Sequence, residues 1–429
     1  DNLFANSLIA LNANTGERIW HYQLVRHDMW DRDLPCPPNL LTVTHNGKKI
    51  DAVAQVTKSA HVFLFNRETG EPLFPIIEHP VPASKLKGEQ AAATQPIPSK
   101  PPQFSRGVIT TDDLTRRTPE AFKYALSIFN NADTDRYFAP PSENGAIIFP
   151  GLDGGGEWGG GAIDPESATL YINASEMPWV LQMLPFNQDP TQSLVETGHR
   201  LYKTNCQICH GKELLGGDSK ATVPPLVNLK ERLDEASVAA TIRKGKGAMP
   251  AFGRLDDLEV KAIAAYLLEK PDEQIPAAQI VNRRRNWPYP YFFNGYKRFQ
   301  DMDGYPAIKP PWGTLNAINL NTGELSWKVP FGSFPELEAQ GIENTGSESY
   351  GGPVVTKGGL IFIAASQDEM MHAYDKDTGD LLWQTKLPAG GFATPATYMV
   401  DGKQYVVIAC GGGKMGRPSG DGYVAFGLE

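Results

Sequence analysis

The sequence predicts a mainly β protein, made of β-propeller blades, into which an all-α domain is inserted. Three observations lead to this fold class. A hairpin pattern that begins at Ala10 returns at Ala317 and again at Ala373. Between the first two copies, the apolar residues change from alternation to the spacing of helices. The 42 glycines and 35 prolines suit a turn-rich folded chain, and 429 residues exceed one ordinary domain.

Each hairpin copy has an alternating strand, a polar turn that closes on Thr-Gly, and a second strand that ends in Trp. The turns and their tryptophans are Thr15-Gly16 with Trp20, Thr322-Gly323 with Trp327, and Thr378-Gly379 with Trp383. A lone hairpin cannot bury its apolar faces, so a repeated hairpin predicts sheets stacked as in a propeller, and roughly four or five blades fit in the chain. A β-sandwich with similar turns is the alternative.

The central part of the chain has the pattern of helices. Apolar residues follow helical spacing in Leu194–Thr204 and in Asp257–Leu268, and prolines punctuate the borders of this region. We therefore expect blades at residues 1–185, an inserted helical domain at 186–275, and the remaining blades at 276–429.

The motif Cys206-Gln207-Ile208-Cys209-His210 carries the most specific chemistry in the sequence. Two thiols separated by two residues can bond both vinyl groups of one porphyrin, and the next residue, His210, then lies beneath the iron as an axial ligand. A redox dithiol or half of a zinc site is the alternative, but zinc would need two further ligands nearby, and the other cysteines are distant. We expect covalently bound haem c.

Met249 is the expected second axial ligand of the iron. It is the only Met between His210 and the last helix, and Gly247 and Pro250 suit a tight loop around it. Alternatively, Met249 only fills core space beside an open or His-ligated iron. Met and His ligation together leave no open position, which predicts electron transfer. The whole insert resembles small class I cytochromes c, including Gly198, Tyr202, Pro224-Pro225-Leu226 and Tyr266.

Charge and hydropathy restrict the partners. The net charge of −9 comes with no basic stripe, which disfavours nucleic acid and leaves a small molecule or a redox protein. No apolar run approaches the ~20 residues of a membrane helix, so no transmembrane segment is expected. Covalent haem attachment implies assembly outside the cytoplasm, where Cys36 and Cys410 are either bridged or two separate thiols.

Five further segments resemble pyrroloquinoline quinone (PQQ) dependent dehydrogenases, most closely the glucose and polyol dehydrogenase branch. The segments are His27–Pro35, Gln55–Lys58, Asn66–Gly70, Phe149–Gly160 and Thr394–Val407. By composition alone, the first could be an ordinary polar loop. The resemblance covers nearly the whole chain outside the insert and implies an eight-bladed propeller, of which about three or four blades are absent here. We therefore expect a native polypeptide that is longer at its N-terminus and supplies the missing propeller half.

The resemblance also implies roles for individual residues. Asp31 would be the general base that takes the substrate hydroxyl proton, and it is the one residue of this chain that could contribute to a calcium site. Lys58 would stabilise negative charge on the quinone oxygens, although by itself it could be an ordinary strand-end lysine. Glu157 and Trp158 would face the cofactor, with Asn common at the position of Glu157 in related alcohol dehydrogenases.

Together these features predict a periplasmic or cell-surface quinohaemoprotein dehydrogenase. By resemblance, it would oxidise an alcohol or sugar hydroxyl at PQQ and pass electrons through the haem to an external acceptor, either a cytochrome or a quinone. The alternative is a propeller that has lost quinone binding and serves as an electron-transfer or interaction module with haem as its sole redox centre. The presence of both Asp31 and Lys58 favours the dehydrogenase.

Overall fold

The chain folds into two compact units. The β unit comprises Asp1–Leu184 and Phe293–Glu429, and the helical unit comprises Pro185–Phe292. The domain limits at 186 and 275 stay a prediction. The computed structural model describes residues 1–133, 137–185, 191–211, 213–216, 224–247, 249–276 and 289–427, without the side chains of 204, 208 and 209.

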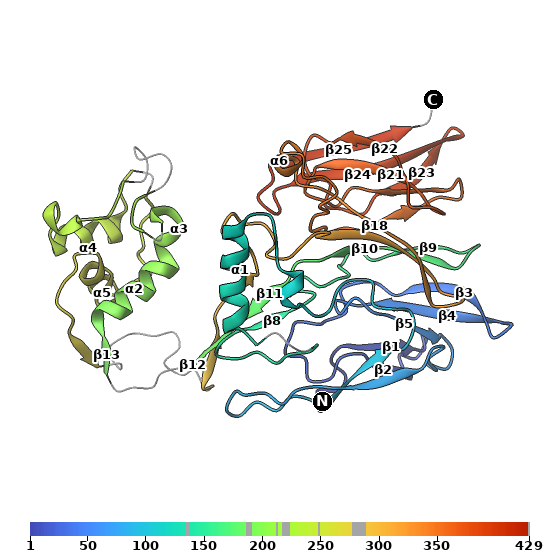
Figure 1. Ribbon diagram of the computed structural model, residues 1–429, viewed down its shortest axis with the longest axis horizontal. Helices are drawn as coiled ribbons and strands as arrows, with labels where there is room; N and C mark the ends of the chain where they lie inside the picture. Colours follow the sequence, from blue (N-terminus) through green and yellow to red (C-terminus); the bar gives the residue numbers. More distant parts are fainter. Residues whose placement is uncertain are drawn as a thin grey trace. The chain divides into compact units, whose positions relative to one another are not determined.

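Five antiparallel sheets follow one another in chain order through the β unit (Figure 1). In the third of them, the helical unit lies in sequence between two of the strands. They are β1 (Ser7–Leu11) and β2 (Arg18–Gln23); β3 (Asn39–His45), β4 (Lys48–Val56) and β5 (Val62–Asn66); β9 (Ala162–Asp164), β10 (Thr169–Ser175), β17 (Gly313–Asn319) and β18 (Glu324–Pro330); β19 (Val354–Val355), β20 (Leu360–Ile363), β21 (Met370–Asp375) and β22 (Leu381–Lys386); and β23 (Ala396–Val400), β24 (Lys403–Gly412) and β25 (Ser419–Gly427). Among the described residues, these sheets do not close into a ring.

Each sheet buries its apolar face against the next. Four mixed clusters connect the five sheets, and representative pairs are Trp20 with Phe65, Leu64 with Leu170, Leu315 with Ile361, and Met371 with Ile408. Burial of this kind is the main stabilising contribution that a repeated hairpin can obtain. The predicted mainly β fold of stacked blades is confirmed.

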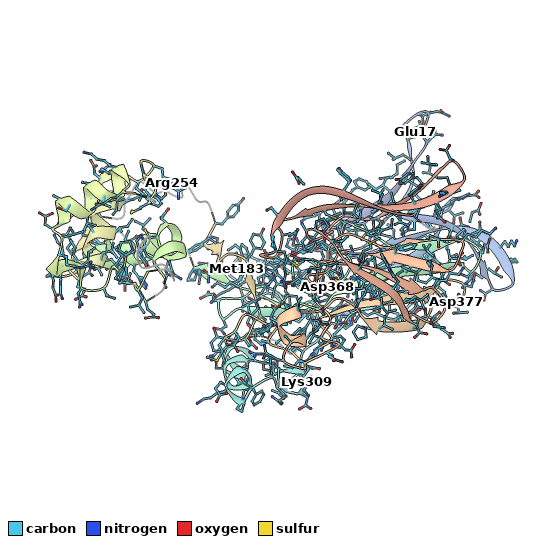
Figure 2. All side chains as sticks on the ribbon, turned by 90° about the horizontal axis from the view of Figure 1, so that it is seen from above. Glu17, Met183, Arg254, Lys309, Asp368 and Asp377 are labelled. Carbon is cyan, nitrogen blue, oxygen red and sulfur yellow. The ribbon has the colours of Figure 1, made fainter. Side chains whose placement is uncertain are left out.

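The repeated Trp and Gly hold neighbouring sheets together. The indole Nε1 of Trp20 donates to the carbonyl of Arg67 at 2.9 Å, in the turn of the next sheet. Gly70 in that turn has a φ of +76°, and a Cβ there would lie 2.6 Å from the Trp20 ring. Trp327 and Gly379 repeat the arrangement, and a Cβ on Gly379 would lie 2.8 Å from the Trp327 ring. Glycine is required both by the backbone angle and by the ring that covers it. Figure 2 labels Asp377, which lies in the turn that contains Gly379.

The helical unit interrupts a single sheet. Strands β10 and β17 are adjacent in register, from Thr169 opposite Asn319 to Ser175 opposite Gly313, although the whole helical unit separates them in sequence. The chain leaves through β11 (Trp179–Leu181) and β12 (Met183–Pro185), and it returns through β15 (Tyr291–Phe293) and β16 (Lys297–Arg298). Strand β11 pairs with β16 and with β8 (Ala146–Ile148), and β12 pairs with β15.

Smaller elements complete the β unit. Helix α1 (Pro119–Asn131) begins at Thr118, whose side chain accepts a hydrogen bond from the backbone of Ala121. It packs through Phe122 and Ala125 against Ile308 and Trp312. The others are β6 (Ile76–Pro80), β7 (Thr94–Pro98), the short helix α6 (Pro335–Glu338) and a 3₁₀ turn at Thr111–Asp113.

The helical unit contains the two helices that the spacing predicted, α2 (Leu194–Asn205) and α5 (Asp257–Leu267). With them are α3 (Gln207–His210), α4 (Glu235–Lys244), a 3₁₀ turn at Leu229–Glu231, and the paired strands β13 (Thr191–Ser193) and β14 (Gln274–Pro276). Among the described residues, no helix has both the length and the apolar character needed to cross a membrane.

Helices α2 and α5 touch backbone to backbone at Gly198. A Cβ at this position would lie 1.8 Å from the carbonyl oxygen of Ala262. We expect Gly198→Ala to destabilise the helical unit by ~1–3 kcal/mol, because even a Cβ forces the two helices to separate. Gly253→Ala is the matched control, since a Cβ there meets nothing within 4 Å. Thermal unfolding of the helical unit measures both variants, and equal midpoints would contradict the close contact.

Candidate functional site

Hydrogen bonds to Asp28 shape the segment that carries Asp31. The Asp28 carboxylate accepts from the backbone N–H groups of Trp30, at 2.8 Å, and Arg32, at 2.6 Å. The indole of Trp30 is buried and donates to the carbonyl of Ala139 at 2.7 Å. Asp31 has a φ of 58°, a left-handed conformation that Asp tolerates better than most residues. Asp31 and Asp33 are left half exposed beside this turn.

Lys58 lies between these two carboxylates. Its Nζ is 3.2 Å from Oδ2 of Asp31 and 2.5 Å from Oδ1 of Asp33, and only 10% of its side chain is exposed. Burial opposes the charge on Lys58, but the ion pairs with Asp33 and Asp31 outweigh it and raise the pKa of Lys58. The structure thus brings Asp31 and Lys58 together around a charged ammonium group. Their roles in a reaction stay a prediction.

A glycine-rich segment, residues 151–160, lies directly on Lys58. The backbone N–H of Gly155 donates to the Lys58 carbonyl at 2.8 Å. Gly154 has a φ of +84°, and a Cβ there would lie 2.4 Å from Cγ of Lys58. Glycine is therefore needed where this segment crosses the lysine stem.

Arg32 ties the Asp31 turn to the glycine-rich segment. Its guanidinium is buried and donates to the carbonyl oxygens of Pro150 and, at 2.7 Å, Gly151. Burial lowers the pKa of Arg32. Sequence reasoning missed this residue, because a single Arg between two aspartates reads as an ordinary polar position.

Glu157 and Trp158 have different surroundings on the same segment. Glu157 is 8% exposed, and its carboxylate accepts from the backbone N–H of Trp158 at 3.2 Å. Burial raises the pKa of Glu157 to about 7, and the nearby Asp153 adds to the rise. The Trp158 side chain is 46% exposed. The cofactor contacts assigned to this pair stay a prediction.

The raised pKa of Glu157 predicts a pH-dependent stability. A carboxyl whose pKa rises from 4.5 to about 7 on folding stabilises the fold fully below its unfolded pKa. This contribution is lost as the pH rises through the folded pKa. Between about pH 5 and pH 8, the free energy of unfolding of Glu157→Gln should therefore fall less than that of wild type, by on the order of 2–3 kcal/mol. Denaturant unfolding of the cofactor-free protein at both pH values measures these free energies. An equal change in the free energy of unfolding of wild type and variant between the two pH values would contradict the prediction.

Cys36 and Cys410 are separate buried thiols. Sγ of Cys36 donates to the carbonyl of Glu157 at 2.7 Å, whereas Cys410 lies in the cluster between the last two sheets. Both are free, so the unbridged alternative is confirmed. Burial raises the pKa of Cys36 to about 12, which makes it an unreactive thiol.

The predicted haem attachment motif lies at the junction of α2 and α3. Cys206 ends α2 and precedes α3, and His210 is the last residue of α3. The Tyr202 hydroxyl donates to the Gly211 carbonyl at 2.6 Å and joins the two helices. The side chain of Cys209 lies outside the described part of the chain.

The surroundings of His210 fit an axial ligand. His210 is buried, and its Nδ1 lies 3.4 Å from the carbonyl oxygen of Pro224. Because a carbonyl only accepts, Nδ1 carries the hydrogen, and the lone pair on Nε2 is left for a metal. Burial lowers the pKa of His210, which favours the neutral imidazole.

Met249 lies in a tight turn on the same apolar cluster as Cys206 and Tyr202. The backbones of Lys246 and Met249 exchange two hydrogen bonds, each of 3.1 Å. Gly245 has a φ of +71°, and a Cβ there would lie 2.5 Å from the Met249 carbonyl. The turn holds Met249 partly buried against this cluster, and its bond to iron stays a prediction.

The described residues bring no cluster of carboxylates together around Asp31. They contain no group of three or more His, Cys, Asp or Glu side chains that could hold a metal ion. Asp31 instead has Lys58 as its ion-pair partner. A contribution of Asp31 to a calcium site stays a prediction.

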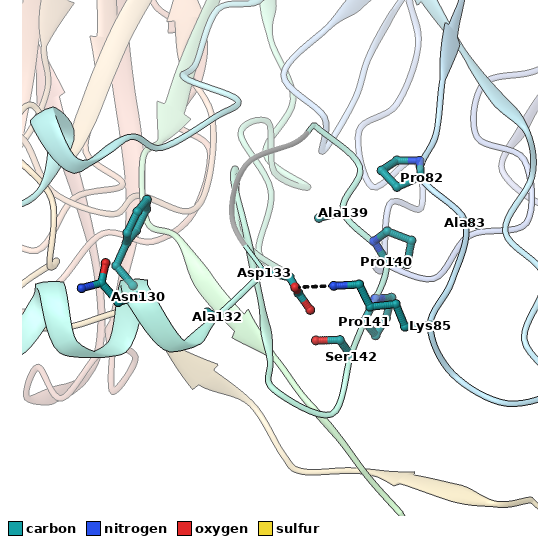
Figure 3. A pocket seen from close by; sticks show the side chains of 11 residues that line it. Pro82, Ala83, Lys85, Asn130, Ala132, Asp133, Ala139, Pro140, Pro141 and Ser142 are labelled. Carbon is teal, nitrogen blue, oxygen red and sulfur yellow. Dashed lines mark hydrogen bonds and ion pairs between the residues drawn. The ribbon is translucent and has the colours of Figure 1, made fainter.

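A cleft of about 650 Å³ lies elsewhere in the β unit, at the C-terminal end of α1 (Figure 3). Lys85 and Asp133 form an ion pair of 2.6 Å within it, and Pro82, Pro140 and Pro141 also line it. None of the site residues predicted from the sequence lines this cleft, so size alone does not identify the candidate centre.

Fold and site together define a β-propeller protein with an inserted cytochrome c domain. The chain belongs to the PQQ family, described as the glucose/ethanol/alcohol dehydrogenase β-propeller domain, whose profile matches residues 1–217 and 260–406. A second profile, described as cytochrome c oxidase, cbb3-type, subunit III, matches residues 193–267. These matches confirm the family and the cytochrome insert that the sequence predicted.

The relatives are quinone-dependent dehydrogenases. Quinoprotein glucose dehydrogenase of Escherichia coli is 31% identical over 99% of this chain and 44% of that protein. Quinate/shikimate dehydrogenase (quinone) of Acinetobacter baylyi is 29% identical over 100% of this chain and 44% of that protein. A match to the crystal structure of quinohemoprotein alcohol dehydrogenase from Comamonas testosteroni covers 99% of this chain and 42% of that protein chain. The two are 20% identical, with a TM-score of 0.49. The chain thus spans less than half the length of these relatives.

Proposed function

We propose that this chain is part of a quinohaemoprotein dehydrogenase that oxidises an alcohol or sugar hydroxyl with PQQ and passes the electrons to a covalently bound haem c. The observation that carries the proposal is the placement of Lys58 between Asp31 and Asp33, directly under the glycine-rich segment. A buried, charged ammonium group can donate hydrogen bonds to a quinone, and the half-exposed carboxylates beside it can accept from a substrate hydroxyl.

In this proposal, Asp31 and Lys58 divide the work. PQQ supplies the quinone carbonyl that accepts a hydride equivalent from the substrate carbon. Asp31, which is half exposed and accessible to a substrate, takes the hydroxyl proton at a carboxylate oxygen. Lys58 donates hydrogen bonds to the quinone oxygens, where negative charge develops. Glu157 and Trp158 face the cofactor from the glycine-rich segment.

The helical unit would serve as the electron outlet. Cys206 and Cys209 hold the haem covalently, His210 and Met249 ligate its iron, and residues 186–275 form the cytochrome domain. The electrons then pass to an external acceptor, a cytochrome or a quinone. Because covalent haem is attached outside the cytoplasm, we place the protein in the periplasm or at the cell surface.

Two measurements test this proposal. Intact-mass analysis of the purified native protein should give a polypeptide longer than 429 residues plus one haem, with blades that complete the propeller. Equilibrium titration of the full-length protein with PQQ, followed by tryptophan fluorescence, should give saturable binding. A mass without haem, or the absence of PQQ binding, would contradict the proposal.

Met249→Ala should leave the haem attached but remove its sixth ligand, since attachment depends on Cys206 and Cys209. The reduced spectrum should change from low-spin to high-spin, and the iron should bind carbon monoxide. Absorbance spectroscopy of the reduced protein measures both effects. An unchanged low-spin spectrum would assign the sixth ligand to another residue.

A further inference from the structure

A second charged cluster supports the glycine-rich segment. Arg298 is its centre, with Nη2 at 3.3 Å from Oδ2 of Asp153 and at 3.2 Å from Oε1 of Glu348. The guanidinium also lies on the ring of Trp179, 4.9 Å from the ring centroid. Tyr350 also belongs to the cluster, and Nζ of Lys414 lies 3.7 Å from the centroid of the Tyr350 ring. We call these residues the Arg298 cluster.

The cluster has two carboxyl groups for one guanidinium. Glu348 is 4% exposed, and its one ion pair in the described structure is with Arg298. Burial raises the pKa of Glu348, the charge of Arg298 opposes this rise, and Asp153 adds to it. Burial, Glu348 and Asp153 raise the pKa of Tyr350, and the charge of Arg298 opposes that rise. Loss of Arg298 would therefore leave a buried acid without a cation, a costly state for a folded protein.

Arg298 connects three segments of the chain that lie far apart in sequence. Asp153 belongs to the glycine-rich segment, Glu348 precedes β19, and Trp179 begins β11, the partner of the strand that carries Arg298. At its other end, the glycine-rich segment contacts the same part of the chain as Glu348. A Cβ on Gly159 would lie 1.9 Å from the backbone of Gly351. The segment is thus held at both ends, and Glu157 and Trp158 lie between.

We propose that Arg298 is a positioning residue for the quinone site. It holds Asp153 and thereby fixes the part of the glycine-rich segment that places Glu157 and Trp158. The inference rests on the proposed function, since it concerns the same site. The ion-pair partners of Arg298 are Asp153 and Glu348, and neither Lys58 nor Asp31 is among its contacts. Arg298 therefore acts on the site through the glycine-rich segment.

A single and a double variant separate positioning from simple stabilisation. In the full-length, cofactor-free protein, Arg298→Gln should lower both the melting temperature and the affinity for PQQ. Arg298→Gln combined with Glu348→Gln removes the stranded acid and should regain most of the melting temperature. Its PQQ affinity should stay about tenfold or more below wild type, because Asp153 still lacks its charged partner. Thermal unfolding and fluorescence titration with PQQ give the two quantities.

Arg117→Gln is the matched control. Arg117 also pairs with two carboxylates, Asp301 at 3.1 Å and Asp303, and lies on the ring of Tyr305, but it does not touch the glycine-rich segment. Its replacement should lower the melting temperature and leave PQQ affinity unchanged. If Arg298→Gln does not fold, Arg298→Lys serves instead, since one ammonium group keeps the charge but cannot hold both carboxylates as a guanidinium does. It should weaken PQQ binding at nearly normal stability.

Three results would overturn the inference: recovery of wild-type PQQ affinity in the double variant, wild-type affinity in a folded Arg298→Lys, or an equal loss of affinity in Arg117→Gln. Each of these leaves the proposed function intact, because wild type still binds PQQ. Absence of PQQ binding by wild type would instead contradict the proposed function, and this inference with it.

Discussion

Asp31→Asn is expected to lower the turnover of the full-length, PQQ-loaded protein by ~10²–10⁴-fold, the usual loss when a positioned base is removed. Asn keeps the shape of the side chain, and its amide can still contact Lys58, but it cannot accept the hydroxyl proton. The haem should be reduced by dithionite and reoxidised by an external acceptor at wild-type rates, because its predicted ligands lie in the other unit. Steady-state turnover and stopped-flow absorbance measure the two reactions.

The neighbouring aspartates provide the controls for this prediction. If Asp31→Asn kept full turnover, Asp31 would not be the base, and Asp33 would be the next candidate because it is also half exposed and paired with Lys58. Asp28 ranks below Asp33, since both of its oxygens accept backbone hydrogen bonds. A simultaneous loss of turnover and of the normal haem spectrum would indicate damaged folding.

Lys58→Met is expected to lower turnover by ~10²–10³-fold, as removal of a donor aimed at developing negative charge does in other enzymes. Met matches the length of the buried stem that Gly154 covers, so the loss should be electrostatic. Lys376→Met is the matched control, because Lys376 is also largely buried and forms an ion pair of 2.7 Å with Asp164. Turnover near wild type in Lys58→Met, or equal losses in the two variants, would contradict the assigned role.

The stacked sheets were predictable because their signal is local. A Thr-Gly turn and a Trp a few residues later lie within one hairpin, and the structure shows that the Trp of one sheet covers the Gly of the next. The haem motif is local for the same reason, since covalent attachment requires a fixed spacing of two thiols. The helices α2 and α5 followed from their apolar period.

Other features depend on contacts between distant segments, which no local pattern reports. The sequence predicted an insert, but only the pairing of β10 with β17 shows that it divides one sheet. The Arg298 cluster joins residues from three separate segments, and the burial of Glu157 depends on how the glycine-rich segment packs on Lys58. Asp31 and Lys58 were expected from family resemblance, and the structure adds Asp33 as the nearer partner of Lys58.

Substrate-dependent reduction of the haem tests the central proposal most directly. The full-length protein with oxidised haem is supplied with PQQ and calcium, then mixed with alcohols and sugars while the absorbance of reduced haem is followed. We predict that at least one substrate reduces the haem, that omission of PQQ abolishes the reduction, and that Asp31→Asn slows it strongly. A haem that dithionite reduces, but that stays oxidised with every alcohol and sugar, would contradict the proposal and favour an electron-transfer or interaction module with haem as its sole redox centre.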